Sequence, residues 1–217
     1  DAIVSNPPYS KSWEGKNNTI LINDVRYSPA GVLAPIQKSD LAFTMHMLYH
    51  LSETGTCAIV EFPGVLYRGN AEKKIREYLI KNNFVDTVIQ LPANLFFGVG
   101  IATCVIVIKK NKKDNNILFV DASEEYEKKG DKNKLADENQ NRIVNAYQER
   151  KEEQYFTKLV SNDEVLANGA NLSVSSYVEK EDKREVIDIV KLNEEIQILQ
   201  SEIFTLNTEI ANKIVSL

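Results

Sequence analysis

The sequence predicts an α/β fold that is followed by a long C-terminal helix. In the first half of its 217 residues, short apolar runs typical of buried strands alternate with amphipathic stretches typical of helices. From Ile189 onward, isoleucine and leucine recur at heptad spacing, which is the pattern of a coiled coil. The composition, 43% hydrophobic and 26% charged, is ordinary for a soluble globular protein, and no run approaches the ~18 apolar residues that span a membrane.

The first strand, residues 1–5, leads into the tetrapeptide Asn6-Pro7-Pro8-Tyr9. Its apolar run predicts a buried strand, and because proline cannot continue a strand ladder, the tetrapeptide lies at the carboxyl end, where open α/β sheets bind ligands. Asn6 offers a carbonyl acceptor, the prolines stiffen the backbone, and Tyr9 offers a flat face on which a base stacks. This set suits an exocyclic amine held for methylation; the alternative is a strand that ends in a proline turn.

The next segment, residues 10–38, is rich in Ser, Asn, Lys, Gly and Pro and predicts a loop. This loop is either a lid over an extruded base or a surface insertion. Asp40 then predicts the N-cap of an apolar, mostly buried helix that extends to about Ser52. His46 and His50 share one face of this helix, and because no carboxylate cluster is nearby we expect structural histidines rather than metal ligands.

Strands and a helix follow in alternation. Residues 57–62 predict a strand, and Asn70 predicts the cap of a helix over residues 71–82. Two further strands are predicted over residues 85–91 and 103–109. We expect them to form an antiparallel pair at one edge of a mostly parallel sheet.

The loop between these two strands contains Phe96, Phe97, Gly98 and Gly100. The glycines allow a tight turn. Paired aromatic side chains at a strand end could supply the second face of a sandwich around an extruded base, with Phe97 favoured because it is nearer the turn. The alternative is that both rings fill the core beneath the loop.

The third quarter of the chain is more polar. Residues 117–121 predict a strand, and the charged residues 123–135 predict a loop with a solvated surface. Asp137 predicts the cap of a helix that carries Ile143.

Cysteines and net charge limit the function classes. Cys57 and Cys104 each lie in an apolar, strand-like run, which favours two buried free thiols over a disulfide or a redox site. The net charge of −5 is not that of a protein that grips DNA unaided, so any DNA contacts depend largely on other parts or on partner chains.

The C-terminal heptads need a partner, because a lone helix cannot bury an apolar seam. Residues 179–185 are highly charged and predict a linker before the helix. The partner could be a second copy, the chain's own domain or another subunit. Lys213 interrupts the seam, whose other members are Ile189, Leu192, Ile196, Leu199, Ile203, Leu206, Ile210 and Leu217.

In order and spacing, these segments resemble the methylation subunits of type I restriction-modification systems, which are N6-adenine DNA methylases. The tetrapeptide is similar to the catalytic motif of amino-methyltransferases that use S-adenosylmethionine. The resemblance covers most of residues 1–178, although Ala170 stands where the family pattern has tyrosine. The segments that carry it are residues 64–72 (GVLYRGNAE), 91–101 (LPANLFFGVGI), 117–123 (ILFVDAS) and 168–172 (NGANL).

The resemblance implies that residues 1–178 are the C-terminal part of a Rossmann-like, S-adenosylmethionine-dependent catalytic domain. Residues 179–217 would then be a linker and a coiled-coil helix for subunit assembly. The family's glycine-rich cofactor loop has no match here and is expected upstream of Asp1, so the fragment alone is not expected to be active. No metal is implied. The implied catalytic residues are Asn6, Pro7, Pro8 and Tyr9, and the implied substrate-binding residues are Tyr9, Phe97 and Phe96.

The implied partners are double-stranded DNA, a restriction subunit and a DNA specificity subunit bound through the C-terminal helix, in the cytoplasm. Two other functions stay open. One is methylation of another amine or amide, such as N5 of a protein glutamine. The other is a non-catalytic assembly subunit that keeps the fold without turnover.

Overall fold

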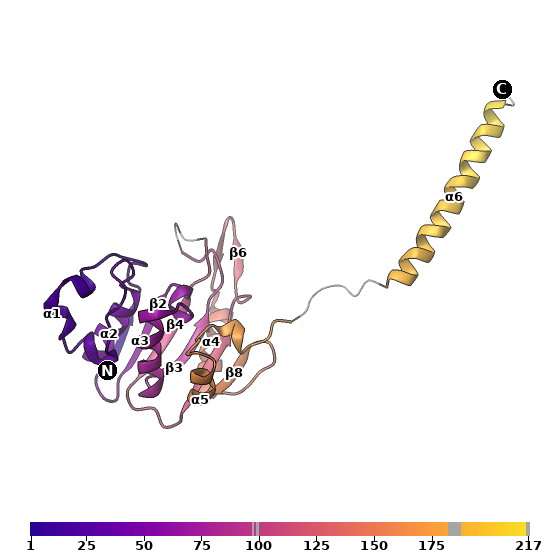
Figure 1. Ribbon diagram of the computed structural model, residues 1–217. Coiled ribbons are helices and arrows are strands. Elements are labelled where there is room, and N and C mark those ends of the chain that lie inside the picture. The colour runs from indigo at the N-terminus through magenta and orange to yellow at the C-terminus, as the bar shows by residue number, and fades with distance from the viewer. Residues whose placement is uncertain (97, 99, 182–187, 216–217) are drawn as a thin grey trace. The chain divides into compact units, whose positions relative to one another are not determined.

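The computed structural model describes residues 1–96, 98, 100–181 and 188–215 (Figure 1). It divides into two units, Asp1–Lys180 and Glu181–Leu217. The larger unit contains a six-stranded mixed sheet with helices, and the smaller one contains a single helix. None of the helices within the described residues has both the length and the apolar character needed to cross a bilayer.

The six-stranded sheet is mixed rather than mostly parallel. Only the β1/β2 and β3/β5 pairings are parallel, and the other three are antiparallel. The predicted β3/β4 pair exists, but it lies in the middle of the sheet, because the apolar β4 also pairs with β2. The strands in spatial order are β1 (Ala2–Ser5), β2 (Thr56–Glu61), β4 (Cys104–Lys109), β3 (Val85–Gln90), β5 (Asn116–Asp121) and β8 (Thr157–Ser161).

Both faces of the sheet are covered. In β5, Ile117 and Phe119 join the main core, whereas Leu118 and Val120 join a second cluster, because successive side chains of a strand point to opposite faces. The second cluster packs against α4 (Asp137–Glu149) through Ile143. The helices on the face of the main core are α2 (Asp40–His50), α3 (Asn70–Lys81) and α5 (Asn162–Ala167).

A buried arginine ties α3 to its surroundings. Arg76 is 1% exposed, and its side chain donates to the carbonyl oxygens of Ala170 at 2.8 Å and Val65 at 2.9 Å. Val65 lies in the short helix η3 (Pro63–Leu66). Burial lowers the pKa of Arg76 to about 10, which leaves it charged at neutral pH. The two acceptors therefore satisfy a buried cation.

Three predicted helix caps are wrong in detail. Ser39, Gly69 and Ala136 occupy the N-cap positions of α2, α3 and α4, and α2 and α3 have no side-chain cap hydrogen bond. Asp40, Asn70 and Asp137 are instead the first helical residues. The Asp40 side chain does not cap the helix, because it accepts a hydrogen bond from the backbone N–H of Ser10.

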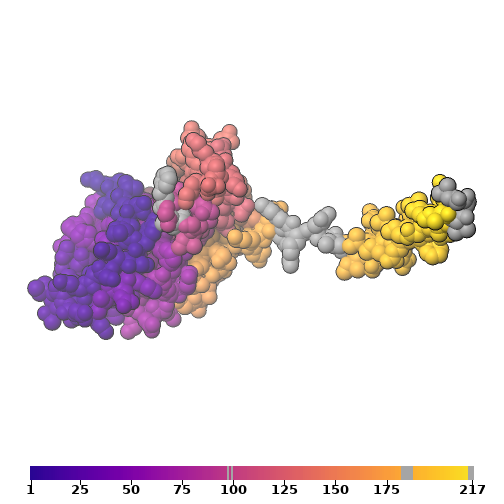
Figure 2. All heavy atoms as spheres, turned by 90° about the horizontal axis from the view of Figure 1, so that it is seen from above, coloured from indigo at the N-terminus to yellow at the C-terminus, as the bar shows by residue number. Residues whose placement is uncertain are grey.

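Residues 10–38 are mainly irregular, as predicted, with short turns at η1 (Gly15–Asn17), α1 (Thr19–Ile22) and η2 (Ser28–Ala30). Farther along, the loop predicted over residues 123–135 contains a hairpin of β6 (Glu127–Lys129) and β7 (Lys132–Lys134). In Figures 1 and 2 this hairpin stands out from the surface of the larger unit. Its strands lack an apolar pattern because β6 is fully exposed.

The first strand is not buried, contrary to the prediction from its apolar run. β1 is an edge strand, and Val4 is 83% exposed. Ile3, on the other face, packs against the main core. The exposure follows from position, because no described segment of this chain covers the face of β1 that carries Val4.

The smaller unit is the helix α6 (Ile189–Val215), which begins where the heptads begin. Its seam side chains are all exposed, between 44% at Ile196 and 69% at Ile189. Leu217, the last predicted seam position, lies outside the described residues, as do residues 182–187 of the predicted linker.

Candidate functional site

The tetrapeptide Asn6-Pro7-Pro8-Tyr9 leaves the sheet at the carboxyl end of β1, as the sequence predicts. The parallel strand β2 ends at the same edge, at Glu61. Asn6 and Pro8 are exposed, Pro7 is buried and Tyr9 is half-buried. The side-chain amide of Asn6 can therefore be reached by a ligand from outside the chain.

Tyr9 and Asn6 contact each other directly. The Tyr9 hydroxyl donates a hydrogen bond to Asn6 Oδ1 at 2.9 Å. A carbonyl oxygen has two lone pairs, so a ligand N–H can still bond to the same atom. The pKa of Tyr9 is raised by burial and, to a lesser extent, by Glu61 and Cys104, so the hydroxyl stays protonated at neutral pH.

The turn after Tyr9 is held by Asp40. Ser10 has a left-handed backbone with φ of 49°, and its N–H donates to Asp40 Oδ1 at 2.7 Å. Asp40 is only 1% exposed. A second bond, from the Ser39 N–H to the Lys11 carbonyl at 3.0 Å, joins the same two segments. The start of α2 thus fixes the chain that leaves the tetrapeptide.

A second buried acid lies at the end of β2. Glu61 is fully buried, and its Oε1 accepts a hydrogen bond from the Thr44 hydroxyl of α2 at 2.9 Å. Its Oε2 has no hydrogen-bond partner, and neither has Asp40 Oδ2. Burial raises the pKa of Glu61 to about 8. Glu61 is therefore a largely neutral acid at pH 7, next to the strand that carries the tetrapeptide.

Sequence reasoning missed both acids as members of this site. Asp40 was read only as a helix cap, and Glu61 was read only as part of a strand. A usable signal exists for Glu61, because it is the single charged residue of an otherwise apolar or small run. Acids in buried strands are rare unless a partner or a raised pKa accommodates them.

The aromatic loop leaves β3 and enters β4 at the same edge of the sheet. Phe96 is half-buried, and its carbonyl accepts a hydrogen bond from Lys132 of β7 at 3.3 Å. Asn133 also donates to the Ala93 carbonyl at 2.8 Å, so the hairpin supports this loop. Within the described part of the chain, no ring contact joins Phe96 to Tyr9. Phe97, the favoured stacking residue, lies outside the described residues.

Cofactor-binding features are sparse. Gly98 and Gly100 follow β3 but lead into the antiparallel β4, so they do not build the strand–glycine–helix turn that cradles a nucleoside cofactor. Cys57 and Cys104 are buried free thiols with raised pKa values, caused by burial. No cluster of His, Cys, Asp or Glu suited to a metal ion occurs among the residues that the structure covers.

Comparison with known proteins gives consistent matches. The N-6 DNA Methylase family model matches residues 1–186. The type I restriction enzyme MpnII methylase subunit of Mycoplasma pneumoniae is 45% identical over 211 residues, covering 97% of this chain and 39% of that protein. The MjaVII methylase subunit of Methanocaldococcus jannaschii is 33% identical over 214 residues, with 93% and 36% covered.

A solved structure agrees with these matches. The crystal structure of the type I restriction-modification system methyltransferase subunit from Streptococcus thermophilus superposes with a TM-score of 0.80 at 43% identity. The match covers 82% of this chain and 38% of that one. The chain therefore spans less than half the length of each of these three relatives.

Proposed function

The chain belongs to the N-6 DNA methylase family, and on this premise we propose that it carries the methyl-acceptor part of a DNA methyltransferase site. The proposed reaction is methylation of adenine at N6 in DNA, with S-adenosylmethionine as the methyl donor. The observation that carries the proposal is the reachable Asn6 amide at the carboxyl end of β1, with the Tyr9 ring beside it.

The chemistry requires placement rather than a strong base. The adenine amine is a weak nucleophile because its lone pair is delocalised into the ring. When Asn6 Oδ1 and a backbone carbonyl of the Pro7-Pro8 frame accept hydrogen bonds from the two N–H groups of the amine, its lone pair points at the methyl group. The amine attacks the methyl carbon, the donor's C–S bond breaks with its electrons going to sulfur, and the amine then loses one proton to solvent.

Tyr9 would hold the base by stacking. Base–aromatic stacking contributes roughly 1–3 kcal/mol for each base. The hydrogen bond from the Tyr9 hydroxyl to Asn6 orients both side chains before the base arrives, and the bond from the Ser10 N–H to Asp40 fixes the turn that follows Tyr9. Phe96 and Phe97 are the proposed second face of this sandwich, together with Tyr9 as substrate-binding residues.

The donor half of the site is proposed to lie outside this chain. Two facts support this: the chain covers 39% of its M. pneumoniae relative, and Gly98 and Gly100 precede an antiparallel strand, β4, rather than a helix. We propose that residues 1–178 are the C-terminal part of a Rossmann-like methyltransferase domain. The residues that bind the cofactor stay unassigned, and this chain alone should be inactive.

The helix α6 is the proposed assembly element of a domain formed by residues 179–217. Its seam carries only isoleucine and leucine from Ile189 to Ile210, and all of them are exposed in this chain. A seam of this kind is buried by pairing as a coiled coil. We favour the helices of a DNA specificity subunit as the partner, within a cytoplasmic complex that also contains a restriction subunit.

The test uses the assembled methylase with radiolabelled S-adenosylmethionine and offers DNA and protein substrates in parallel. Label should enter DNA, and Asn6→Ala should lower kcat at least about 100-fold, as removal of a positioned polar group in an active site does. Asn145→Ala, an exposed asparagine on α4, is the matched control and should leave the rate unchanged.

The outcomes separate the three functions. Label in protein rather than DNA would favour the amide methyltransferase. No label in either substrate, from a complex that assembles normally, would favour the non-catalytic subunit. Wild-type rates for Asn6→Ala would refute the assignment of Asn6.

A further inference from the structure

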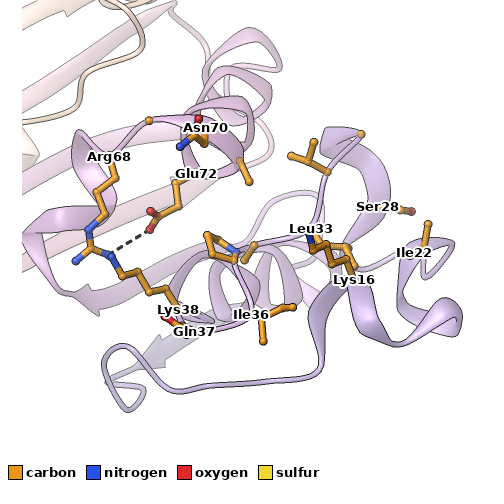
Figure 3. Close-up of a pocket in the computed structure, with 16 residues that line it drawn as sticks. Lys16, Ile22, Ser28, Leu33, Ile36, Gln37, Lys38, Arg68, Asn70 and Glu72 are labelled. Carbon is orange, nitrogen blue, oxygen red and sulfur yellow. Dashed lines mark hydrogen bonds and ion pairs between the residues drawn. The ribbon is translucent and has the colours of Figure 1, made fainter.

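A cleft of about 1000 Å³ opens between the loop segment of residues 16–38 and the start of α3 (Figure 3). Its apolar wall includes Ile22, Leu33 and Ile36. Figure 3 shows Lys38 and Arg68 at the same end of the cleft as Glu72, whereas Lys16 lies toward the other end, beside Leu33. The cleft thus combines an apolar side with a charged end.

The guanidinium of Arg68 is held in one place. Its Nη1 pairs with Glu72 Oε1 at 3.4 Å, and the group lies 5.3 Å from the centre of the Phe62 ring. It also packs against Gly64, because a Cβ added there would collide with Arg68 Cζ. The Glu72 carboxylate is 4% exposed, whereas the Arg68 side chain is 21% exposed. Within this ion pair, the positively charged Arg68 is therefore the partner that a ligand can reach.

The charge of the cleft is opposite to that of the whole chain. The lining contains three cations, Lys16, Lys38 and Arg68, and one carboxylate, Glu72, in a protein whose net charge is −5. A local excess of positive charge with one fixed guanidinium is suited to an anion, since arginine's planar fork matches phosphate oxygens. The apolar wall suits a ligand that also presents carbon surface, as the sugar of a nucleotide does.

The cleft is joined to the tetrapeptide by short connections. Lys38 is two residues from Asp40, whose carboxylate accepts the Ser10 N–H at 2.7 Å. The backbone of Trp13 also donates to the Ile36 carbonyl at 2.9 Å, so the segment after Tyr9 lies along the segment that lines the cleft. The segment that lines the cleft and the segment that leaves the tetrapeptide are therefore in direct contact.

We propose that this cleft binds a backbone phosphate of the DNA strand that presents adenine to Tyr9, with Arg68 and Lys38 contacting the phosphate oxygens. This inference rests on the proposed function and adds a binding site to it. Phosphate contacts fix the position of a strand without reading its sequence, so the cleft contributes affinity and placement, whereas recognition of the target sequence is left to other surfaces.

The test measures how DNA affinity of the assembled methylase depends on salt. Each phosphate contact contributes about 0.9 to the slope of log K against log salt concentration. Lys38→Gln should weaken target and non-target DNA alike and reduce that slope by about one. Gly64→Ala, which displaces the Arg68 guanidinium, should also weaken DNA binding and reduce the salt slope. Lys74→Gln, an exposed lysine of α3 outside the cleft, is the matched control.

Two results would overturn the proposal. One is a salt slope for Lys38→Gln equal to that of Lys74→Gln. The other is impaired subunit assembly with an unchanged salt slope, which would make the cleft a protein-docking site. Failure of the proposed function is distinguishable, because it appears as a lack of methyl transfer to DNA by the wild-type enzyme.

Discussion

Replacing Glu61 by glutamine should change how the stability of this protein depends on pH. In the wild type, the Glu61 pKa is raised from 4.5 to about 8 by burial. Below pH 4.5 the carboxyl group is protonated in both the folded and the unfolded state, and it then costs the fold no ionisation energy. As the pH rises toward 8, ionisation of the carboxyl group lowers the free energy of the unfolded chain, whereas the folded chain keeps the proton and is not stabilised in this way.

The size of the effect follows from the two pKa values. At about 1.4 kcal/mol for each pH unit, the wild-type free energy of unfolding should fall by roughly 3 to 4 kcal/mol between pH 5 and pH 8 because of this group alone. Glutamine does not titrate, and its carbonyl can keep the Thr44 hydrogen bond. The free energy of unfolding of Glu61→Gln, relative to that of the wild type, should therefore rise by the same amount between pH 5 and pH 8.

Denaturant unfolding at pH 5, 6.5 and 8, followed through the fluorescence of the single tryptophan, measures this difference. Glu53→Gln is the control, because that carboxylate is 86% exposed. The pH-independent cost of the new amide cancels when the two pH values are compared. Parallel pH profiles for wild type and Glu61→Gln would refute the reasoning and place the Glu61 pKa near its ordinary value.

Three further predictions concern the base, the assembly helix and the core. Tyr9→Ala should raise the KM for DNA roughly 5- to 150-fold through lost stacking, measured in the assembled enzyme; an unchanged KM would remove Tyr9 from the site. Deleting residues 189–217 should abolish binding to the specificity subunit in size-exclusion chromatography, and undiminished complex formation would contradict the role of α6. Arg76→Ala should cost roughly 3 kcal/mol in unfolding experiments because two buried carbonyls lose their donor; a cost below about 1 kcal/mol would show that water replaces it.

Elements with a strong apolar pattern could be predicted from the sequence. The strands β2 to β5 and the helices α2, α3 and α6 fall within a few residues of their predicted bounds, because their buried faces impose a clear period. The hairpin β6/β7 was missed because exposed strands need no such pattern. The edge strand β8 was missed because only Thr157 and Val160 of its five residues are buried, which is too few for an apolar run. The place of β4 in the sheet was also missed, because strand pairing depends on contacts between distant segments.

The candidate site was only half visible in the sequence. Asn6 and Tyr9 were predicted because the tetrapeptide follows an apolar run, and the structure brings the two side chains into contact, whereas their roles stay a prediction. Asp40 could not be identified, because an acidic side chain usually indicates the surface and only the folded chain shows that this one is buried. The signal for Glu61, a single charge in an apolar strand, indicates burial but not its place beside the tetrapeptide. The position of Arg68 could not be predicted either, because it depends on packing against Gly64 and on the ion pair with Glu72.

The mixed sheet has a practical consequence at the rim that faces away from Asn6. The connections α2–β2, α3–β3 and β4–β5 all turn there, at residues 51–55, 82–84 and 110–115. Within the last of them, Lys113 and Asp114 are exposed. An epitope tag or a fluorescent label inserted at that point would lie at the rim opposite the proposed base site, and exposed loop tips of this kind commonly accept such insertions.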